Sequence, residues 1–284
     1  MIYLVVVSIV WAFSFGLIKG QLTGIQPEVV ASIRLLLCVV SFLPCLLFLK
    51  SFKPNSKLML LGALQFGVMY LAYIQSYQYL PGYLVAVFTI FTPMYVLLVN
   101  AVINKYFNMK HLLPVLISIV GASVIVFKSP QQAEFITGFL LLQLANIAFA
   151  IGQVSYKHVA KDQPDSENML WMYIGAALLA STYTVINVDL SQVNIAAKQW
   201  WALIYLGVIS SGLCFYFWNK GSKQVNTPTL AVMNNGYVPL AVIFAITFFA
   251  ESADYMRLSI GGALIGLSVY LAYSMQKKPV KINT

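Results

Sequence analysis

The chain has 284 residues, of which 60% are hydrophobic and only 9% are charged, and its formal net charge is +9. Its mean hydropathy is +0.82. Soluble domains carry about 25% charged residues, so this composition excludes an ordinary soluble enzyme, a disordered chain and a collagen-like repeat. The sequence therefore predicts a polytopic membrane protein embedded in the lipid bilayer.

Ten stretches are apolar enough to cross a bilayer, which requires roughly 20 residues per helix. The loops between them are too short to form a separate domain. Because lipid tolerates no unpaired backbone groups, all of them are expected to be helical. The predicted fold class is thus an all-α integral membrane protein with ten transmembrane helices. In chain order they cover about residues 2–18, 28–49, 58–79, 83–104, 111–128, 135–156, 168–188, 199–219, 228–250 and 258–275.

The basic residues are unevenly distributed between the loops. If the N-terminus is cytoplasmic, twelve of the 17 lysines and arginines fall in the inner loops and the tail, and four fall in outer loops. This asymmetry follows the positive-inside rule and predicts a multi-pass protein of the bacterial inner membrane with both termini cytoplasmic. It also accounts for the net charge, so no nucleic-acid partner is expected.

The two halves of the chain show weak internal similarity at an offset near 145 residues, carried by the pairs Gly62/Gly207, Gly67/Gly212 and Pro93/Pro239. Five spans per half is an odd number, so the halves are expected to enter the membrane in opposite senses. Such inverted repeats place a binding site near the bilayer midplane, where the halves meet. The predicted repeats are 1–128 and 135–284, the second with a short basic cytoplasmic tail, and 129–134 is the linker.

Polar and aromatic side chains inside the spans mark the expected substrate site, because polar groups are costly in hydrocarbon. Aromatic walls with several amides suit an organic molecule of moderate size better than a narrow ion pore. Adjacent residues of a helix point about 100° apart, so one of two neighbouring asparagines is expected to reach substrate and the other another helix. The candidates are Trp11, Ser14, Tyr70, Tyr73, Asn146, Gln153, Tyr216, Trp218, Asn219, Asn234 and Asn235.

Arg34 is the ionisable residue that lies clearly within a span. Two interpretations stay open: a structural arginine that snorkels outward or binds a backbone carbonyl, and a cation that attracts an anionic substrate group. The acidic residues fall near the span ends, so a carboxylate proton relay is not predicted. The spacing of the histidines, cysteines and serines predicts neither a metal site nor a catalytic set, so neither a cofactor nor an enzyme is expected.

Two further motifs bear on conformational change and assembly. Pro93 and Pro239 are predicted to kink the fourth and ninth spans and to free backbone carbonyls for gating. Gly262 and Gly266 form a pair of small residues suited to close helix contact. Packing within the chain is the favoured interpretation of this pair, and a homodimer face is the alternative.

The sequence resembles the drug/metabolite transporter superfamily, in its branch with two EamA domains. The string Trp11-Ala12-Phe13-Ser14-Phe15 is similar to the opening motif of that family, and Arg34 lies where the branch often has an arginine. Other stretches are more specific and resemble the biotin-carrying group of the carboxylate, amino acid and amine transporters. These stretches are residues 65–70, 88–93, 143–152, 156–157, 218–219, 233–235 and 238–239.

The resemblance implies a ten-helix bundle of inverted repeats that carries a small organic solute by alternating access. Biotin uptake is the leading expectation. Biotin has a carboxylate for a cation, a ureido ring for amides and an apolar bicycle for aromatic rings, but an amino acid with a large side chain would fit the same groups. Export of amino acids or related metabolites is therefore the alternative, and a membrane protein without transport is a third class.

Overall fold

The computed structural model describes residues 1–22, 24–48, 54–80, 85, 88–126, 135–160, 164–249 and 254–275. Within these ranges the chain forms helices joined by turns, and no strand occurs among them. The predicted linker at 129–134 and the basic tail beyond residue 275 lie outside the described residues. Most of the predicted spans can therefore be compared directly with the structure.

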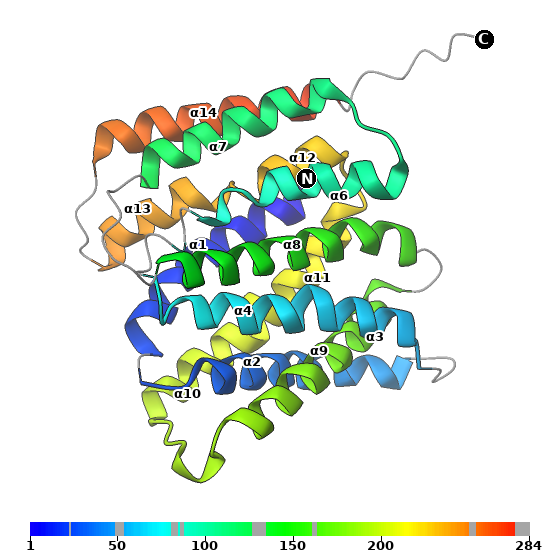
Figure 1. The fold of residues 1–284 in the computed structure, drawn as a ribbon, viewed down its shortest axis with the longest axis vertical. Coiled ribbons are helices and arrows are strands. Elements are labelled where there is room, and N and C mark those ends of the chain that lie inside the picture. The colour runs from blue at the N-terminus through cyan, green and yellow to red at the C-terminus, as the bar shows by residue number, and fades with distance from the viewer. Residues whose placement is uncertain are drawn as a thin grey trace.

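The helices follow the hydropathy pattern, but several spans are built from more than one segment (Figure 1). Before the linker they are α1 (Ile2–Gln21), α2 (Pro27–Phe42), α3 (Ser56–Gly62), the π-helical η2 (Ala63–Val68), α4 (Met69–Ser76), α6 (Thr92–Asn104) and α7 (Leu112–Val126). After it come α8 (Phe135–Val159), α9 (Asp165–Asn187), α10 (Ala197–Ile204), the π-helical η5 (Tyr205–Leu213), α11 (Cys214–Ser222), α12 (Thr227–Met233), α13 (Tyr237–Phe249) and α14 (Tyr255–Ser274). Short 3₁₀ turns occur at Leu43–Phe48, Met109–His111 and Leu190–Gln192.

Polar caps set where several of these helices begin. Asn55, Asn226 and Asp254 each accept a hydrogen bond from a backbone N–H in the first turn of α3, α12 and α14. These bonds satisfy donors that have no partner within the helix. Pro27 and Glu28 occupy the first turn of α2, where proline needs no N–H partner and an acidic group complements the helix dipole.

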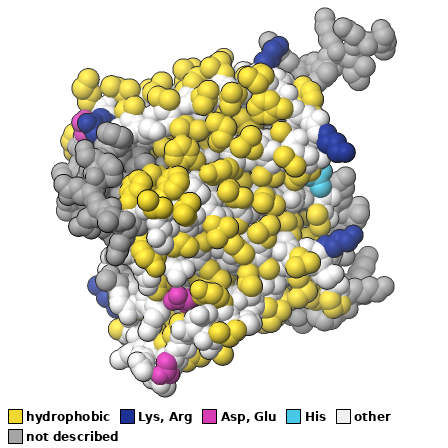
Figure 2. Space-filling model, in the orientation of Figure 1, with side chains coloured by type: hydrophobic (Ala, Val, Ile, Leu, Met, Phe, Trp, Pro, Cys, Tyr) yellow, Lys and Arg dark blue, Asp and Glu magenta, His cyan; other side chains and the backbone are white. Residues whose placement is uncertain are grey.

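The described residues form helices and no strands, as predicted, and several of the helices are able to cross a membrane. Six described helical segments are long and apolar enough to cross a membrane, and Ile2–Ser14, Thr92–Asn104 and Met109–Ile125 are shorter apolar helices. Figure 2 shows hydrophobic side chains over the middle of the visible face, with charged side chains toward the two ends of the helices. The six segments are Pro27–Cys45, Ser56–Ser76, Phe135–Val159, Asp165–Asn187, Ala197–Ser222 and Tyr255–Ser274.

The most extensive helix contacts join the two parts of the chain. At one edge of the bundle α7 packs against α14, and toward the opposite edge α2 and α3 pack against α9 (Figure 1). Between these layers α1 contacts α11 and α13, and α8 contacts α4 and α6. The segments before and after the linker therefore interleave, and the interior of the bundle is built from both.

Glycines allow the closest of these contacts. A Cβ atom on Gly62 would lie 2.0 Å from the Met172 carbonyl oxygen, and one on Gly175 would lie 2.0 Å from the Met59 carbonyl oxygen. The backbones of α3 and α9 thus touch without intervening side chains, as small residues permit in membrane helices.

Gly121 and Gly261 make the corresponding contact between α7 and α14. A Cβ atom on Gly261 would lie 2.4 Å from the Gly121 carbonyl oxygen. The predicted pair lies on a neighbouring face: the nearest atom to a Cβ on Gly262 is 3.9 Å away, and a Cβ on Gly266 would meet nothing within 4 Å. Close packing within the chain is therefore carried by Gly261 instead.

We expect the Gly62→Ala variant to lose about 1–3 kcal/mol of stability, because the new methyl group overlaps backbone that can move only by separating two helices. Thermal unfolding of the purified protein in detergent measures this loss. Gly266→Ala is the matched control, since it adds the same methyl group to a helix with open space beside it. Equal unfolding temperatures for the two variants would contradict the close contact.

Candidate substrate site

Two spans are interrupted by turns in the interior of the bundle. The fourth span turns at Ile90 and Phe91 before α6 begins, and the ninth turns at 234–236 between α12 and α13. Pro93 and Pro239 lie in the first turn of the segment that follows each break. The predicted mid-helix kinks are corrected accordingly: each break precedes its proline, which then starts a new helix where its missing N–H is not needed.

The carbonyls near the break in the fourth span are occupied by side-chain donors, contrary to the prediction that they are free. The donors come from the span itself, from α8 and from the ninth span. Thr89 Oγ1 also lies 2.7 Å from Tyr237 Oη, which joins the two breaks directly. The capping bonds are Asn146 Nδ2 to Phe88 O at 2.8 Å, Thr92 Oγ1 to Thr89 O at 2.7 Å and Asn235 Nδ2 to Ile90 O at 3.3 Å.

The π-helical segment η5 presents carbonyls to three neighbouring helices, because a π-turn departs from the regular α-helical hydrogen-bond ladder. Trp11 Nε1 of α1 donates to Ser210 O at 2.9 Å, and Tyr173 Oη of α9 donates to Gly212 O at 2.6 Å. Cys38 Sγ of α2 lies 3.3 Å from Gly207 O. These contacts fix the irregular backbone and the Trp11 side chain together.

A cavity of about 120 Å³ lies between α1, α2, α4, α8 and η5, next to the two helix breaks. Ligand pockets enclose roughly 300–1,000 Å³, so this cavity must widen to admit a solute of that class. The structure brings seven of the predicted residues together around it: Trp11, Ser14, Arg34, Tyr70, Tyr73, Asn146 and Asn234.

The lining also includes residues that the sequence analysis missed. Three of the polar ones, Thr89, Thr92 and Tyr237, lie within four residues of Pro93 or Pro239, and this proximity in the sequence is the signal that could have found them. The apolar lining residues carried no sequence signal, because the sequence does not distinguish an apolar residue that faces a cavity from one that faces lipid. The missed residues are Ile18, Met69, Thr89, Thr92, Ala145, Phe149, Ser210, Phe215 and Tyr237.

Five predicted residues do not line the cavity, because their side chains are engaged elsewhere. Asn219 forms an amide pair with Gln65 at 2.9 and 3.4 Å, which joins α11 to η2. Asn235 reaches the break in the fourth span, as described above, and Tyr216 packs against Phe42 and Phe217. The other two are Gln153 and Trp218.

Gln153 and Trp218 form a buried layer beside the cavity. Trp218 Nε1 donates to Gln153 Oε1 at 2.9 Å, and the Gln153 amide contacts the Asn234 amide at 3.3 and 3.4 Å. The ring of Trp218 lies 4.9 Å from that of Trp11. Gln153 and Trp218 therefore hold two cavity residues, Trp11 and Asn234, through aromatic and amide contacts.

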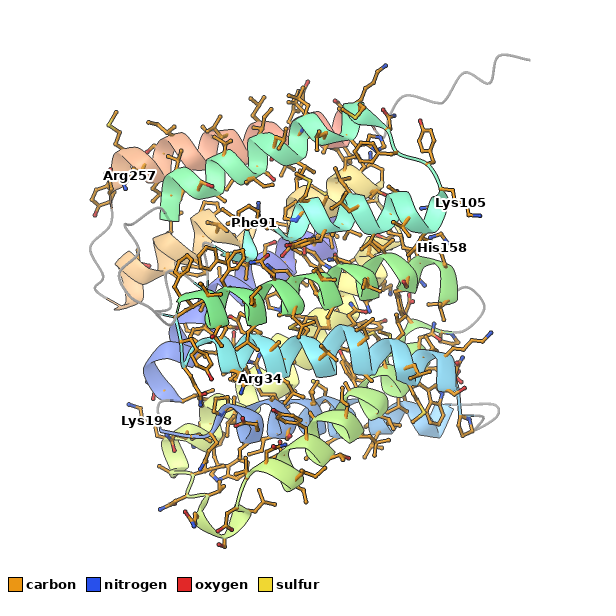
Figure 3. All side chains as sticks on the ribbon, viewed as in Figure 1. Arg34, Phe91, Lys105, His158, Lys198 and Arg257 are labelled. Atoms are coloured by element: carbon orange, nitrogen blue, oxygen red, sulfur yellow. The ribbon has the colours of Figure 1, made fainter. Side chains whose placement is uncertain are left out.

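Arg34 supplies the charge of the cavity. It is only 2% exposed, and Figure 3 places it in the interior, whereas Lys198 and Lys105 lie at opposite ends of the helices. Its Nη2 donates to Tyr70 Oη at 2.7 Å and to Ser211 Oγ at 3.0 Å. The guanidinium thus points inward to two hydroxyls, and it neither snorkels nor binds a backbone carbonyl.

One nitrogen of this guanidinium is left without a protein partner. Arg34 Nη1 is buried and makes no hydrogen bond, and among the described residues that line the cavity none is acidic. The Arg34 Cζ atom lies 4.5 Å from the centre of the Tyr70 ring, which offers a weak cation–π contact. A buried cation with a free donor and no carboxylate beside it can bind an anionic group.

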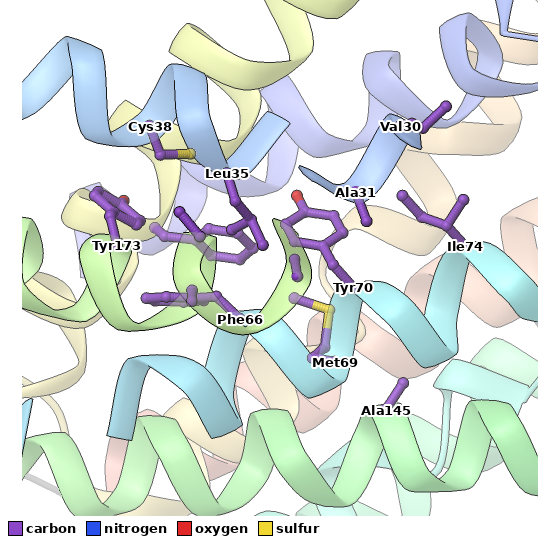
Figure 4. Close-up of a cluster of buried hydrophobic side chains, with 14 of the residues drawn as sticks. Val30, Ala31, Leu35, Cys38, Phe66, Met69, Tyr70, Ile74, Ala145 and Tyr173 are labelled. Carbon is purple, nitrogen blue, oxygen red and sulfur yellow. The ribbon is translucent and has the colours of Figure 1, made fainter. Parts of the chain in front are cut away.

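Tyr70 is itself held by a tightly packed apolar cluster. Figure 4 shows Leu35 and Cys38 of α2 facing Phe66 and Tyr70, with Tyr173 beside them. Phe66, Cys38 and Tyr173 are fully or almost fully buried. Rigid packing on this side of the cavity restricts the position of the Tyr70 hydroxyl.

The comparison with known families decides the class of protein. The profile of the EamA-like transporter family matches residues 1–127 and 136–274. The chain belongs to the EamA-like transporter family. It is 36% identical over 276 residues to a protein of Pseudomonas aeruginosa named as a probable biotin transporter, an alignment that covers 95% of this chain and 96% of that protein.

Relatives from two other bacteria are named biotin transporters and have a similar sequence identity to this chain. The biotin transporters of Salmonella typhimurium and Escherichia coli K12 are each 32% identical over 279 residues, covering 95% of this chain and 92% of each relative. A solved crystal structure superposes with a TM-score of 0.81 at 16% identity, covering 97% of this chain and 98% of that one. That likeness concerns the fold alone. This EamA-family chain is therefore a membrane transporter, as the first-span motif and the polar spans implied.

We expect Asn235→Ala to lower stability by about 1–3 kcal/mol, because Ile90 O would remain buried without its donor. Thermal unfolding in detergent checks this. Asn104→Ala is the control, since Asn104 is exposed and donates only to the side chain of Asn100. A loss as large in the control as in Asn235→Ala would refute the capping role of Asn235.

Proposed function

We propose that the chain is a secondary transporter of the bacterial inner membrane that takes up biotin by alternating access. The observation that carries this proposal is the buried and unpartnered Nη1 of Arg34, a residue that lines a cavity whose described lining has no acidic residue. An unpaired buried cation is costly, and a carboxylate that enters the cavity removes that cost. The relatives at 36% and 32% identity are named as biotin transporters, and biotin carries a carboxylate, so their names support this proposal.

The remaining lining suits the other parts of biotin. Trp11, Phe149 and Phe215 form an aromatic wall for an apolar bicycle, and their rings contact one another at 5.4–6.1 Å. Asn146 and Asn234 supply amide oxygens near the helix breaks, which can accept hydrogen bonds from the N–H groups of a ureido ring, because their Nδ2 groups already donate to protein acceptors. The cation and the amides come from different helices, so a substrate that spans the cavity would contact both.

The proposal includes two inverted five-helix repeats, residues 1–128 and 135–284, with both termini cytoplasmic. Three pairs of features support it. The π-helical segments η2 and η5 occupy the third and eighth spans, and the breaks occupy the fourth and ninth. The packing is reciprocal as well: α1 contacts α11 and α13, just as α8 contacts α4 and α6. Rocking of one repeat against the other would then open the cavity to each side in turn.

Export of amino acids is the second candidate, and the cavity favours it less. An amino acid in its usual form carries an ammonium group as well as a carboxylate. The described lining offers that ammonium only neutral acceptors, beside the positive charge of Arg34. Repulsion between the ammonium group and the Arg34 guanidinium opposes binding of a zwitterion in a poorly solvated site.

Uptake of radiolabelled biotin tests the function. We expect saturable uptake when the chain is expressed in a bacterial strain that lacks its own biotin carrier, and growth of a biotin auxotroph on trace biotin. An uncoupler added to the same cells reports whether uptake depends on the proton gradient. Absence of uptake by correctly inserted protein, together with export of amino acids, would overturn the proposal in favour of the second candidate.

Arg34→Gln removes the charge and keeps a polar side chain of similar reach. We expect the KM for biotin to rise about 100-fold, the size of effect seen when one partner of a buried charge pair is lost. Arg257→Gln is the control, because Arg257 is half exposed at the start of α14 and pairs with Asp254 there. Unchanged KM in Arg34→Gln would remove Arg34 from the site.

A further inference from the structure

Ser211 lies directly behind Arg34, yet it does not line the cavity. The residue is fully buried in the π-helical segment η5. Its Oγ lies 3.0 Å from Arg34 Nη2, 3.3 Å from Arg34 Nε and 2.8 Å from Tyr70 Oη. It also donates to the Leu206 carbonyl oxygen at 2.7 Å. The Ser211 hydroxyl thus contacts both nitrogens of the guanidinium edge formed by Nε and Nη2, and it also contacts Tyr70, the other partner of Nη2.

The hydroxyl protons of this group can be assigned from the contacts. A serine hydroxyl has a single proton and two lone pairs. The proton of Ser211 is used by Leu206 O, so Ser211 must accept from Tyr70 and from Arg34. The Tyr70 hydroxyl in turn accepts from Arg34 Nη2 and donates to Ser211. Neither hydroxyl has a proton left for a substrate.

This assignment leaves Nη1 as the guanidinium nitrogen of Arg34 that has no hydrogen-bond partner. Nε and Nη2 of Arg34 share the remaining lone pair of Ser211 in a forked contact, and Nη2 also donates to Tyr70, whereas Nη1 has no partner. Carboxylates usually pair with arginine through two nitrogens at once. Here the edge formed by Nε and Nη2 is filled by the protein, so an incoming carboxylate meets Nη1.

The π-turn is what brings Ser211 to this position. A serine in a regular helix bonds the carbonyl three or four residues earlier. Ser211 instead bonds the carbonyl five residues earlier, because the turn is widened by one residue. The carbonyls around it are held by Tyr173 and Trp11, so the turn is fixed from both sides.

We propose that Ser211 is a positioning residue that sets the selectivity of the transporter for a carboxylate over a neutral end group. This inference rests on the proposed function of the cavity and on the role of Arg34 in it. Ser211 acts by blocking the guanidinium edge formed by Nε and Nη2, and by holding Nη1 toward the bound substrate. Without the hydroxyl, the guanidinium loses its anchor and turns toward Tyr70 and the vacated space.

The test is competition against radiolabelled biotin uptake in proteoliposomes, with unlabelled biotin and with biotinamide, which lacks the carboxylate charge. The quantity is the ratio of the two inhibition constants. We expect Ser211→Ala to reduce the preference for biotin about ten-fold, with little change in the inhibition constant of biotinamide. Ser211→Thr keeps the hydroxyl and should keep most of the preference.

Ser268→Ala is the matched control, because Ser268 is also fully buried and donates to a helix carbonyl at 2.7 Å, but lies in α14 away from the cavity. A preference in Ser211→Ala equal to that of the unaltered chain would overturn the inference, whatever the change in transport rate. An equal loss in Ser211→Ala and Ser211→Thr would overturn it too. If the unaltered chain takes up no biotin, the proposed function itself fails, which is a separate outcome.

Discussion

A single buried cation imposes most of the constraints on this molecule. Arg34 is almost fully enclosed, and its cavity has no acidic residue in the part of the lining that the structure describes. Its charge is tolerated because Tyr70 and Ser211 accept three of its hydrogen bonds and the Tyr70 ring lies against it. Hydroxyls and rings reduce the cost of burial without cancelling the charge. The site can therefore form while its positive charge stays uncompensated, and a bound anion would neutralise that charge.

The irregular segments of the helices serve the same arrangement. The π-turn in η5 brings Ser211 to Arg34 and offers a carbonyl to Trp11, and the paired breaks bring Asn234 and Tyr237 to the cavity. The π-turn in η5 and the break in the fourth span each receive hydrogen bonds from side chains of the other part of the chain, as in the bonds from Trp11 to Ser210 O and from Asn235 to Ile90 O. Because lipid offers no alternative partners, these bonds couple the position of one part to that of the other.

The fold class could be predicted from hydropathy. Apolar stretches and charged loops predicted an all-helical membrane protein, and the motif around Trp11 predicted the family, which the comparison confirms. The helix irregularities could not be predicted in the same way. Gly62 and Gly207 recur at the repeat offset, but a π-turn depends on partners such as Tyr173 that only the folded chain brings near.

The site was predicted less completely for a related reason. Polarity inside a span marks a residue that needs a partner, but it does not say whether that partner is substrate or protein. Asn219 and Gln65 satisfy each other, whereas Asn146 caps a helix break and still faces the cavity. Ser211 was missed because a serine in an apolar helix ordinarily bonds its own backbone. Only the tertiary contacts separate these cases.

The uncompensated guanidinium has an electrical consequence. An empty cavity carries one positive charge in the interior of the membrane, and a cavity that holds a monoanion carries none. The membrane potential acts on a charge in its field with about 2.3 kcal/mol per 100 mV for a full crossing. In the alternating-access cycle proposed above, the voltage would therefore act on the step in which the unloaded carrier changes its orientation, and the loaded carrier would change orientation without moving this charge.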